Sequence, residues 1–477
     1  MNAVTDLVLS SEAIHLITKE QAWHYRVLPI RGNDKVLALY CEGDCDVGPL
    51  KMELEMLTGK EITLENLPAG DISRLLSKYY LRESGHGSIS SIQMDYNAED
   101  FLTNLIMEAK NLKSSDIHIE SYEHTARVRI RIDGMMVQRY ILKKEDYPAL
   151  INKIKILSNL DISEKRLPQD GRIHFQEKQH AFDIRVSILP TLHGEKVVLR
   201  LLNNDATNID LYQLGFSDFD LDHYLEGVRR PNGILLISGP TGSGKTTTLY
   251  ATLKLLNKET RNILTVEDPV EYTLEGINQV QLKESIGLGF ASALRTFLRQ
   301  DPDVIMVGEI RDTETAGMAI RAALTGHLVL STIHTNSAWG TISRLMDMGI
   351  PPFLVANTLN TTVAQRLLRL LCPNCKEQVA LNPAVYPKHF IPYEILSHHS
   401  IAKGCEACYY TGYKGRKAVY EVIPIDQEFA EAIKKGNLNV QELLKIRGIG
   451  TLAENAFQLF AQGETTIDEI YPLLFNY

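Results

Sequence analysis

Hydrophobic and polar residues alternate along this chain with two distinct periods. From Arg127 to Ile132, arginines alternate strictly with valine and isoleucine. A period of two predicts a strand with the apolar side chains buried and three arginines on the other face. A solvated face and a face turned toward an anion or another subunit are both compatible with this pattern. The Asp133-Gly134 pair that follows predicts a turn, and residues 100–110 have the spacing of an amphipathic helix.

The later part of the chain alternates short, wholly apolar runs with stretches that suit helices. The apolar runs are residues 234–238, 263–266, 304–307 and 328–332. This rhythm predicts βαβ units, and therefore a parallel sheet covered by helices. At the end of the chain, residues 466–469 read Thr-Ile-Asp-Glu, the spacing of a capping box, and predict a last short helix.

Length and composition indicate a multidomain α/β protein. The chain has 477 residues, of which 44% are hydrophobic and 23% charged, an ordinary globular composition that excludes a disordered, collagen-like or small disulfide-bonded protein. A length of this kind favours about three domains. The small and polar residues 85–91 indicate a linker. We expect a small N-terminal domain over 1–85, a linker over 86–95, a middle domain over 96–206 and a C-terminal domain over 207–477.

Charge and hydrophobicity narrow the class of partner. The 50 basic and 59 acidic residues give a formal charge of −9, whereas proteins that mainly bind nucleic acid are usually basic. No run of about 18 apolar residues is present, so we expect no transmembrane segment. The N-terminus does not have the pattern of a secretory signal. Four of the six cysteines form two CxxC pairs, which favours a reducing compartment and a metal site.

One motif predicts a nucleotide site. Residues 239–246 fit GxxxxGK[ST] and stand between an apolar run and a helix-compatible one. The glycines let backbone N–H groups face phosphate oxygens, and the helix N-terminus adds partial positive charge. Lys245 would reach the β- and γ-phosphates of ATP, and the Thr246 hydroxyl would ligate Mg²⁺. The expected binding residues are Gly239, Pro240, Thr241, Gly242, Ser243, Gly244, Lys245, Thr246 and Thr247.

Hydrolysis also needs a carboxylate, and two strand ends offer one. Glu309 follows the run 304–307, and Glu267-Asp268 follows the run 263–266. The carboxyl ends of parallel strands lie beside the phosphate loop in open α/β folds. A carboxylate there can complete the Mg²⁺ shell or orient the attacking water. The residues alone leave open which of the two glutamates is the base.

Two histidines bracket the run 328–332. We expect His327 and His334 to lie at the same edge of the sheet as the phosphate loop, where they could sense the γ-phosphate or couple subunits. The alternative is that each is an ordinary core or surface histidine.

The cysteine pairs predict a structural zinc site. Cys372 and Cys375 are separated from Cys405 and Cys408 by 29 residues. Four thiolates satisfy tetrahedral Zn²⁺ and leave no open position for catalysis. The stretch between the pairs is rich in proline, histidine and aromatic residues, and metal binding would supply about 10 kcal/mol of folding energy. Free thiols, a redox pair, or ligation by His398 and His399 are the alternatives.

Taken together, these blocks resemble the assembly ATPases of bacterial type II secretion systems and type IV pili. The resemblance covers residues 96–477 and includes the cysteine pairs. Its other blocks are LPQDGR at 167–172, DIRVSILPTLHGEKVVLRL at 183–201, GPTGSGKTTT at 239–248, TVEDPVEY at 265–272, LRQDPDVIMVGEIRD at 298–312 and ALTGHLVLSTIHTN at 323–336.

The resemblance implies a cytoplasmic, hexameric motor with three domains. These would be an N-terminal domain that docks on an inner-membrane platform or adaptor protein, a PAS-like α+β middle domain and a RecA-like ATPase domain. ATP would bind between the middle and C-terminal domains. Glu309 would be the catalytic glutamate, supported by Glu267 and Asp268. Arg185 and Arg200 fall where the middle domain of such enzymes offers arginines to the γ-phosphate.

Three other functions are compatible with parts of the sequence. A retraction or DNA-uptake motor of the same superfamily is disfavoured by the cysteine pairs and the extra N-terminal domain. A RecA-like nucleic-acid translocase is disfavoured by the negative charge. A scaffold that binds nucleotide without turnover is disfavoured by the complete set of Lys245, Thr246, Glu267 and Glu309.

Overall fold

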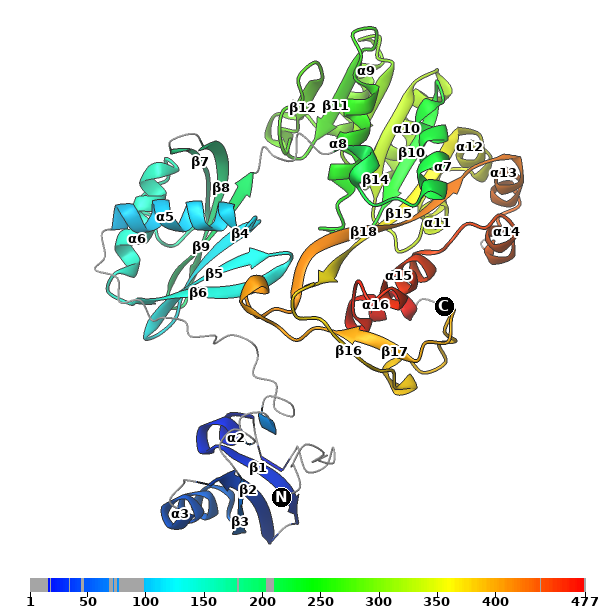
Figure 1. Ribbon diagram of the computed structural model, residues 1–477. Coiled ribbons are helices and arrows are strands. Elements are labelled where there is room, and N and C mark those ends of the chain that lie inside the picture. The colour runs from blue at the N-terminus through cyan, green and yellow to red at the C-terminus, as the bar shows by residue number, and fades with distance from the viewer. Residues whose placement is uncertain are drawn as a thin grey trace. The chain divides into compact units, whose positions relative to one another are not determined.

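The chain forms two compact units, residues 1–89 and 90–477 (Figure 1). The computed structural model describes residues 16–17, 19–33, 35–43, 47–67, 72, 75–76, 98–177, 180–202, 210–437 and 439–475. The expected linker, 86–95, lies outside these residues. Within the described ranges, no helix combines the length and hydrophobicity needed to cross a membrane.

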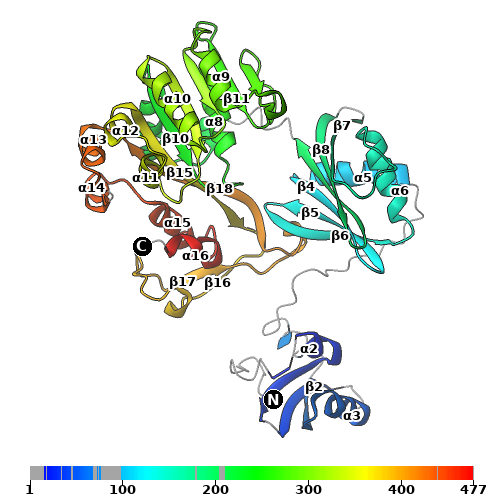
Figure 2. The ribbon, with the colours of Figure 1, turned by 180° about the vertical axis from the view of Figure 1, so that it is seen from behind.

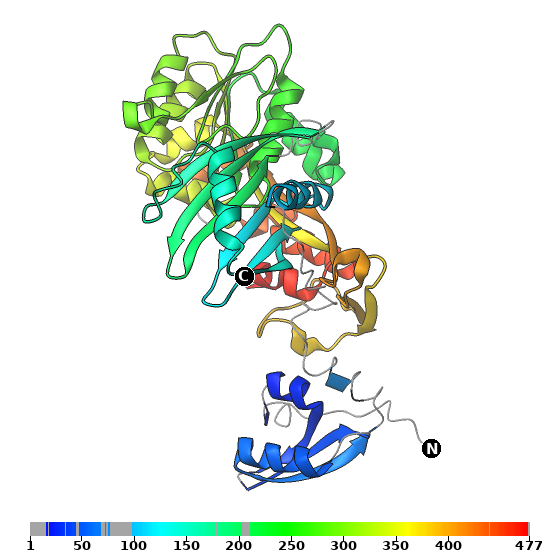
Figure 3. The same cartoon turned by 90° about the vertical axis from the view of Figure 1, so that its left-hand side faces the viewer.

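The first unit is a three-stranded sheet with helices against it (Figures 1 and 3). Its elements are α2 (Lys19–Tyr25), β1 (Val27–Gly32), β2 (Val36–Glu42), α3 (Val47–Thr58) and β3 (Glu61–Leu67). Strand β2 lies in the centre, antiparallel to β1 and parallel to β3, because α3 provides the crossover that a parallel pair requires. Leu28, Leu39, Leu54 and Ile62 are buried in its core.

The second unit begins with an antiparallel six-stranded sheet of order β6-β5-β4-β9-β8-β7. Its elements are α5 (Ala98–Asn111), β4 (Asp116–Ser121), β5 (Thr125–Ile132), β6 (Met135–Lys143), α6 (Tyr147–Leu157), β7 (Gln169–Glu177), β8 (His180–Thr191) and β9 (Gly194–Leu202). Helices α5 and α6 cover one face of the sheet (Figure 3), and their apolar side chains pack against it. The other face carries arginines.

The predicted alternating strand is confirmed as β5. Val128 and Ile130 are fully buried and Ile132 is partly buried against the same core. Asp133 and Gly134 have φ angles of +48° and +86° and form the turn to β6. The arginines of β5 are paired rather than free in solvent, because Arg127 and Arg129 both contact Glu120 of β4.

The rest of the second unit is built on a seven-stranded sheet of order β12-β11-β13-β14-β10-β15-β18. The strands are β10 (Gly233–Ser238), β11 (Ile263–Glu267), β12 (Asn278–Gln281), β13 (Val304–Val307), β14 (Leu328–Ile333), β15 (Leu359–Leu371) and β18 (Tyr413–Pro424). All pairs are parallel except β15 with β18. The four predicted apolar runs are thus confirmed as β10, β11, β13 and β14.

Helices bury both faces of this sheet (Figures 1 and 2). They are α7 (Asp218–Arg229), α8 (Lys245–Leu256), α9 (Phe290–Phe297), α10 (Thr313–Leu324), α11 (Gly340–Asp347) and α12 (Pro352–Thr358). In β10, Ile234 and Leu236 join the core beneath α9, α10 and α11, whereas Leu235 and Ile237 join the core beneath α7 and α8. Burial on both sides explains why these strands are apolar without alternation.

A small subdomain stands between β15 and β18. It holds the hairpin β16 (Glu377–Ala380) and β17 (His398–Ile401), and the chain ends in α13 (Gln427–Lys434), α14 (Gln441–Ile446), α15 (Leu452–Ala461) and α16 (Ile467–Leu474). The predicted last helix is confirmed as α16, but its capping box is wrong. The Thr466 side chain makes no cap hydrogen bond, because its hydroxyl lies 2.8 Å from that of Tyr413, and Glu469 pairs with Arg369 instead.

Candidate nucleotide site and cysteine cluster

The phosphate loop, residues 239–246, connects β10 to the first turn of α8. Gly244 has a φ of +88°, a conformation that glycine adopts without strain. Gly239 packs against β15, since a Cβ added there would lie 2.5 Å from the Gln365 carbonyl oxygen. These positions explain why the loop needs glycines, and they leave its N–H groups near the positive end of α8.

Lys245 is folded into the phosphate loop. Its ammonium donates to the carbonyl oxygens of Gly239 at 2.8 Å and Pro240 at 3.0 Å, and the residue is 9% exposed. Burial lowers the pKa of Lys245, while the negative charge of Glu309 opposes that shift. The buried Ser243 hydroxyl has no hydrogen-bond partner among the described residues. A curled loop with a buried cation and a spare hydroxyl fits a phosphate chain.

Glu309 stands two residues beyond β13 and faces the same edge of the sheet. Its side chain is 15% exposed, and its two oxygens contact the Arg311 guanidinium and, at 3.5 Å, the Nε2 atom of His334. The hydrogen bond to Glu309 raises the pKa of Arg311. The structure therefore brings together Lys245, Glu309 and His334, as the sequence predicted for this edge.

Glu267 occupies a different environment at the end of β11. The residue is 3% exposed, and its carboxylate accepts hydrogen bonds from the hydroxyls of Tyr250 and Thr265 and from the amide of Gln279. Burial, together with the Glu267 charge, raises the pKa of Tyr250 strongly. Asp268, by contrast, is exposed. A carboxylate held by three donors is oriented firmly, so Glu267 suits a supporting role better than proton transfer.

The expectation that the two histidines share one edge of the sheet is wrong. His334 follows the carboxyl end of β14, but His327 precedes its amino end, where its backbone oxygen bonds Gly233 at the start of β10. The ring of His327 contacts the Ala322 carbonyl and the Thr325 hydroxyl. Six strand residues separate the two histidines, since bracketing a strand places residues at its opposite ends.

Arg185 and Arg200 lie opposite each other on β8 and β9. Arg185 donates to the Val270 carbonyl at 2.7 Å and pairs with Glu271 at 3.2 Å, both just beyond Glu267-Asp268. Arg200 pairs with Asp116 of β4 at 2.8 Å and keeps 60% of its side chain exposed. Arg200 is therefore largely exposed and Arg185 only partly so, and the role of both toward a γ-phosphate stays a prediction.

Two residues beside the phosphate loop were not predicted. Gln365 accepts from the Thr248 hydroxyl at 3.0 Å, and Arg366 donates to the Asn336 carbonyl at 3.1 Å. Both belong to β15, which pairs with β10. The available signal was an adjacent Gln-Arg pair inside the otherwise apolar run 363–368.

The four cysteines predicted as zinc ligands converge at one point, here called the cysteine cluster. Their Sγ atoms lie within 4.8 Å of one another, with separations of 3.9 Å for Cys372–Cys405 and 3.8 Å for Cys375–Cys408 and Cys405–Cys408. A tetrahedron with Zn–S bonds of about 2.3 Å has edges of about 3.8 Å, whereas a disulfide requires about 2.05 Å. The donor set therefore fits zinc.

Backbone hydrogen bonds to sulfur also hold the cysteine cluster in place. The Sγ of Cys408 accepts backbone N–H bonds from Cys405 and Gly412, each at 3.2 Å. Among the described residues, the four cysteines are the only cluster of three or more His, Cys, Asp or Glu side chains that could hold a metal, and His398 and His399 are not part of it. The ring of His399 instead packs near that of Phe460.

Comparisons with known proteins place the chain among secretion and pilus proteins. The family described as type II/IV secretion system protein matches residues 93–472. The type IV pilus assembly ATPase PilB of Myxococcus xanthus is 42% identical over 98% of this chain and 87% of its own length. The type II secretion system protein E of Pseudomonas aeruginosa is 47% identical over 77% of this chain and 74% of its own.

Solved structures share the fold. The pilus retraction motor PilT with bound ADP is 27% identical, with a TM-score of 0.54 over 78% of this chain and 96% of that one. The ATPase DotB of Legionella pneumophila has a TM-score of 0.62 over 81% of this chain and 98% of that one, at 21% identity. The resemblance seen in the sequence is thereby confirmed, and the chain belongs to the family of type II/IV secretion system proteins.

Proposed function

We propose that this protein is an ATPase that couples ATP hydrolysis to the assembly of a type IV pilus or a type II secretion pseudopilus. The observation that carries the proposal is the meeting of Lys245, Glu309 and His334 at one sheet edge, beside the phosphate loop. The relatives named as pilus assembly and type II secretion proteins supply the process. Their names, together with the cysteine cluster, favour assembly over retraction.

The chemistry follows from the positions of the side chains. Backbone N–H groups of the loop and the Lys245 ammonium would bind the phosphates, and Thr246, exposed in the first turn of α8, would hold Mg²⁺. Glu309 would orient or deprotonate the attacking water. We favour Glu309 over Glu267 as the base because three donors already occupy the buried Glu267 carboxylate.

The mechanical part of the proposal rests on the domains. In it, residues 207–477 are a RecA-like ATPase domain, 96–206 a PAS-like domain and 1–85 a domain that docks on a platform or adaptor protein at the cytoplasmic face of the inner membrane. Six chains form a ring, and Arg185 and Arg200 approach a γ-phosphate when a site closes. Zinc in the cysteine cluster stabilises the small subdomain and takes no part in hydrolysis.

The test is the Glu309→Gln variant of the full chain. The amide keeps the size of the side chain but cannot take a proton, so steady-state ATP turnover should fall by about a hundredfold or more, while nucleotide affinity by calorimetry stays within about twofold of wild type. Glu431→Gln, on the exposed surface of α13, is the matched control and should leave both unchanged. Turnover close to wild type in Glu309→Gln would remove Glu309 from the mechanism.

A further inference from the structure

Arg366 lies against the first residue of the phosphate loop, although it is far away in the sequence. Ser238 of β10 is paired with Ala364 of β15, so the next residues of β15 run beside the loop. A Cβ built on Gly239 would lie 3.2 Å from the Nη1 atom of Arg366. The parallel pairing of β10 with β15 therefore fixes a guanidinium at the start of the loop.

The contacts of this guanidinium are all neutral. Nη1 donates to the Gln365 carbonyl at 3.0 Å, and Nη2 donates to the carbonyl of Asn336 at 3.1 Å and to its side-chain oxygen at 3.4 Å. Within the described part of the chain, no carboxylate forms an ion pair with Arg366, whereas Arg185, Arg200 and Arg311 each have one. A half-buried cation with only carbonyl partners is poorly compensated.

A second cation makes the same region still more positive. Burial lowers the pKa of Lys245, and the charge of Arg366 adds to that shift. Burial also lowers the pKa of Arg366, against the opposing charge of the buried Glu421. Two cations that repel each other beside a phosphate loop favour a ligand with several negative charges.

The γ-phosphate is the part of ATP that Arg366 can reach. The lysine of this motif contacts the β- and γ-phosphates, and the Lys245 ammonium lies at the Gly239 and Pro240 carbonyls. The start of the loop is therefore its γ-phosphate end. With ADP, which has no γ-phosphate, Arg366 would keep its hydrogen bonds to Gln365 and Asn336.

We propose that Arg366 senses the γ-phosphate within its own chain and transmits its presence to residues 336–338. The inference rests on the proposed ATPase function. To contact phosphate, the guanidinium must give up Asn336, which lies two residues beyond His334. The adjoining Ser337 carbonyl accepts the Ser238 hydroxyl at 3.3 Å, and the Ala338 N–H donates to Glu421 at 2.8 Å. When Arg366 exchanges Asn336 for phosphate, the change is therefore passed along the chain to His334, which faces Glu309.

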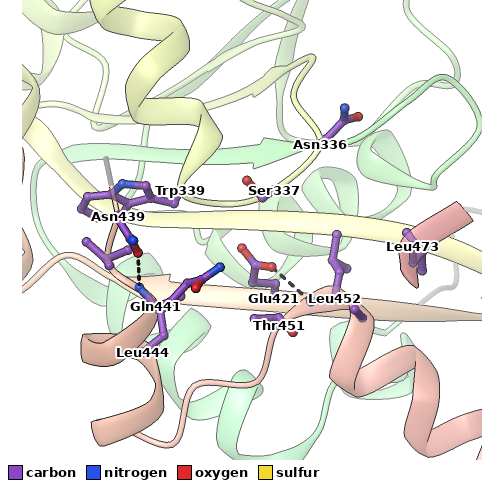
Figure 4. Close-up of a pocket in the computed structure, with 12 residues that line it drawn as sticks. Asn336, Ser337, Trp339, Glu421, Asn439, Gln441, Leu444, Thr451, Leu452 and Leu473 are labelled. Atoms are coloured by element: carbon purple, nitrogen blue, oxygen red, sulfur yellow. Dashed lines mark hydrogen bonds between the residues drawn. The ribbon is translucent and has the colours of Figure 1, made fainter. Parts of the chain in front are cut away.

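Residues 336–338 have space into which they can move when Arg366 changes its partners. They border a cavity of about 330 Å³, whose lining includes Ser337, Trp339, Glu421 and Leu452 (Figure 4). Glu421 links these residues to α15, because its second oxygen accepts the Leu452 N–H at 3.1 Å. A shift of residues 336–338 can therefore be taken up by the cavity rather than by the packed core of the sheet.

Calorimetry with the full chain tests the proposal. Affinities for Mg²⁺-AMP-PNP and for Mg²⁺-ADP are measured for wild type, Arg366→Gln and Arg366→Lys. Loss of a charge-assisted contact made only to the γ-phosphate should weaken AMP-PNP binding of Arg366→Gln by about tenfold or more and leave ADP binding within about twofold. The compact lysine ammonium should give an intermediate preference. Arg369→Gln, on the same strand but paired with Glu469, is the matched control and should keep the wild-type preference.

Several results would overturn the inference. Equal weakening of both nucleotides would mean that Arg366 only shapes the loop, and an unchanged preference would mean that it touches no phosphate. Should Arg366→Gln fail to fold by thermal unfolding, a wild-type preference in Arg366→Lys would contradict the guanidinium contact. Wild type that neither binds nor hydrolyses ATP would defeat the proposed function itself, whereas an active wild type with an insensitive Arg366 defeats only this inference.

Discussion

At the scale of the residue, the two candidate glutamates are separated by their surroundings and not by their type. Both follow an apolar strand, which is all that the sequence offers. The fold then buries Glu267 among three hydrogen-bond donors and leaves Glu309 near Lys245 and His334. Two of the three donors, Tyr250 of α8 and Gln279 of β12, come from other elements, so periodicity alone could not assign the roles.

Replacing Tyr250 by phenylalanine tests the supporting role of Glu267. Without the hydroxyl, one oxygen of a buried carboxylate loses a donor, and the free energy of unfolding should fall by about 1–3 kcal/mol. Urea denaturation measures the change. Tyr212→Phe, with an exposed ring, is the control and should change the unfolding free energy by less than about 0.5 kcal/mol. An equally small effect in Tyr250→Phe would show that the hydrogen bond adds no stability.

At the scale of the element, the sequence predicted the four central strands, the phosphate loop and the β5 hairpin, because each has a local pattern. It assigned no element to residues 359–371 or 413–424, now β15 and β18. Runs buried on both faces lack alternation, and a long one cannot be told from a helix by periodicity. For the same reason Arg366 was missed, since its place beside Gly239 depends on the pairing of β10 with β15.

The small subdomain between β15 and β18 should depend on metal. Its hairpin has four-residue strands, and its aromatic residues pack only partly against α15. We therefore expect one zinc per chain by elemental analysis, and the Cys372→Ser variant or treatment with a chelator should lower the melting temperature by several degrees. Cys41→Ser, a buried cysteine of the first unit, is the control for loss of a thiol and should keep the zinc. Absence of zinc from purified wild type would rule the site out.

At the scale of the whole molecule, two of the cations expected at the nucleotide site lie outside the sheet that carries the phosphate loop. Arg185 and Arg200 stand on a sheet of their own, one bonded to the segment after Asp268 and the other largely exposed. In the proposed motor, the middle domain would carry these guanidinium groups into or out of a site as a unit, which would make hydrolysis depend on domain position. That dependence is what a motor requires, and a rigid nucleotide-binding scaffold would not need it.

Arg200→Ala tests this link between chemistry and movement. Its guanidinium would contact the γ-phosphate only in the closed site, so turnover should fall by about a hundredfold while ATP affinity changes by less than about threefold. Arg166→Ala, from the same domain and with a side chain 88% exposed, should leave turnover unchanged. In a ring where one chain supplies the arginine and its neighbour the phosphate loop, mixing Arg200→Ala with Lys245→Ala should restore part of the turnover, since some sites then combine two intact halves. Equal loss of affinity and turnover would leave Arg200 with a binding role only, and mixtures that stay inactive would place the arginine and the loop of each site in one chain.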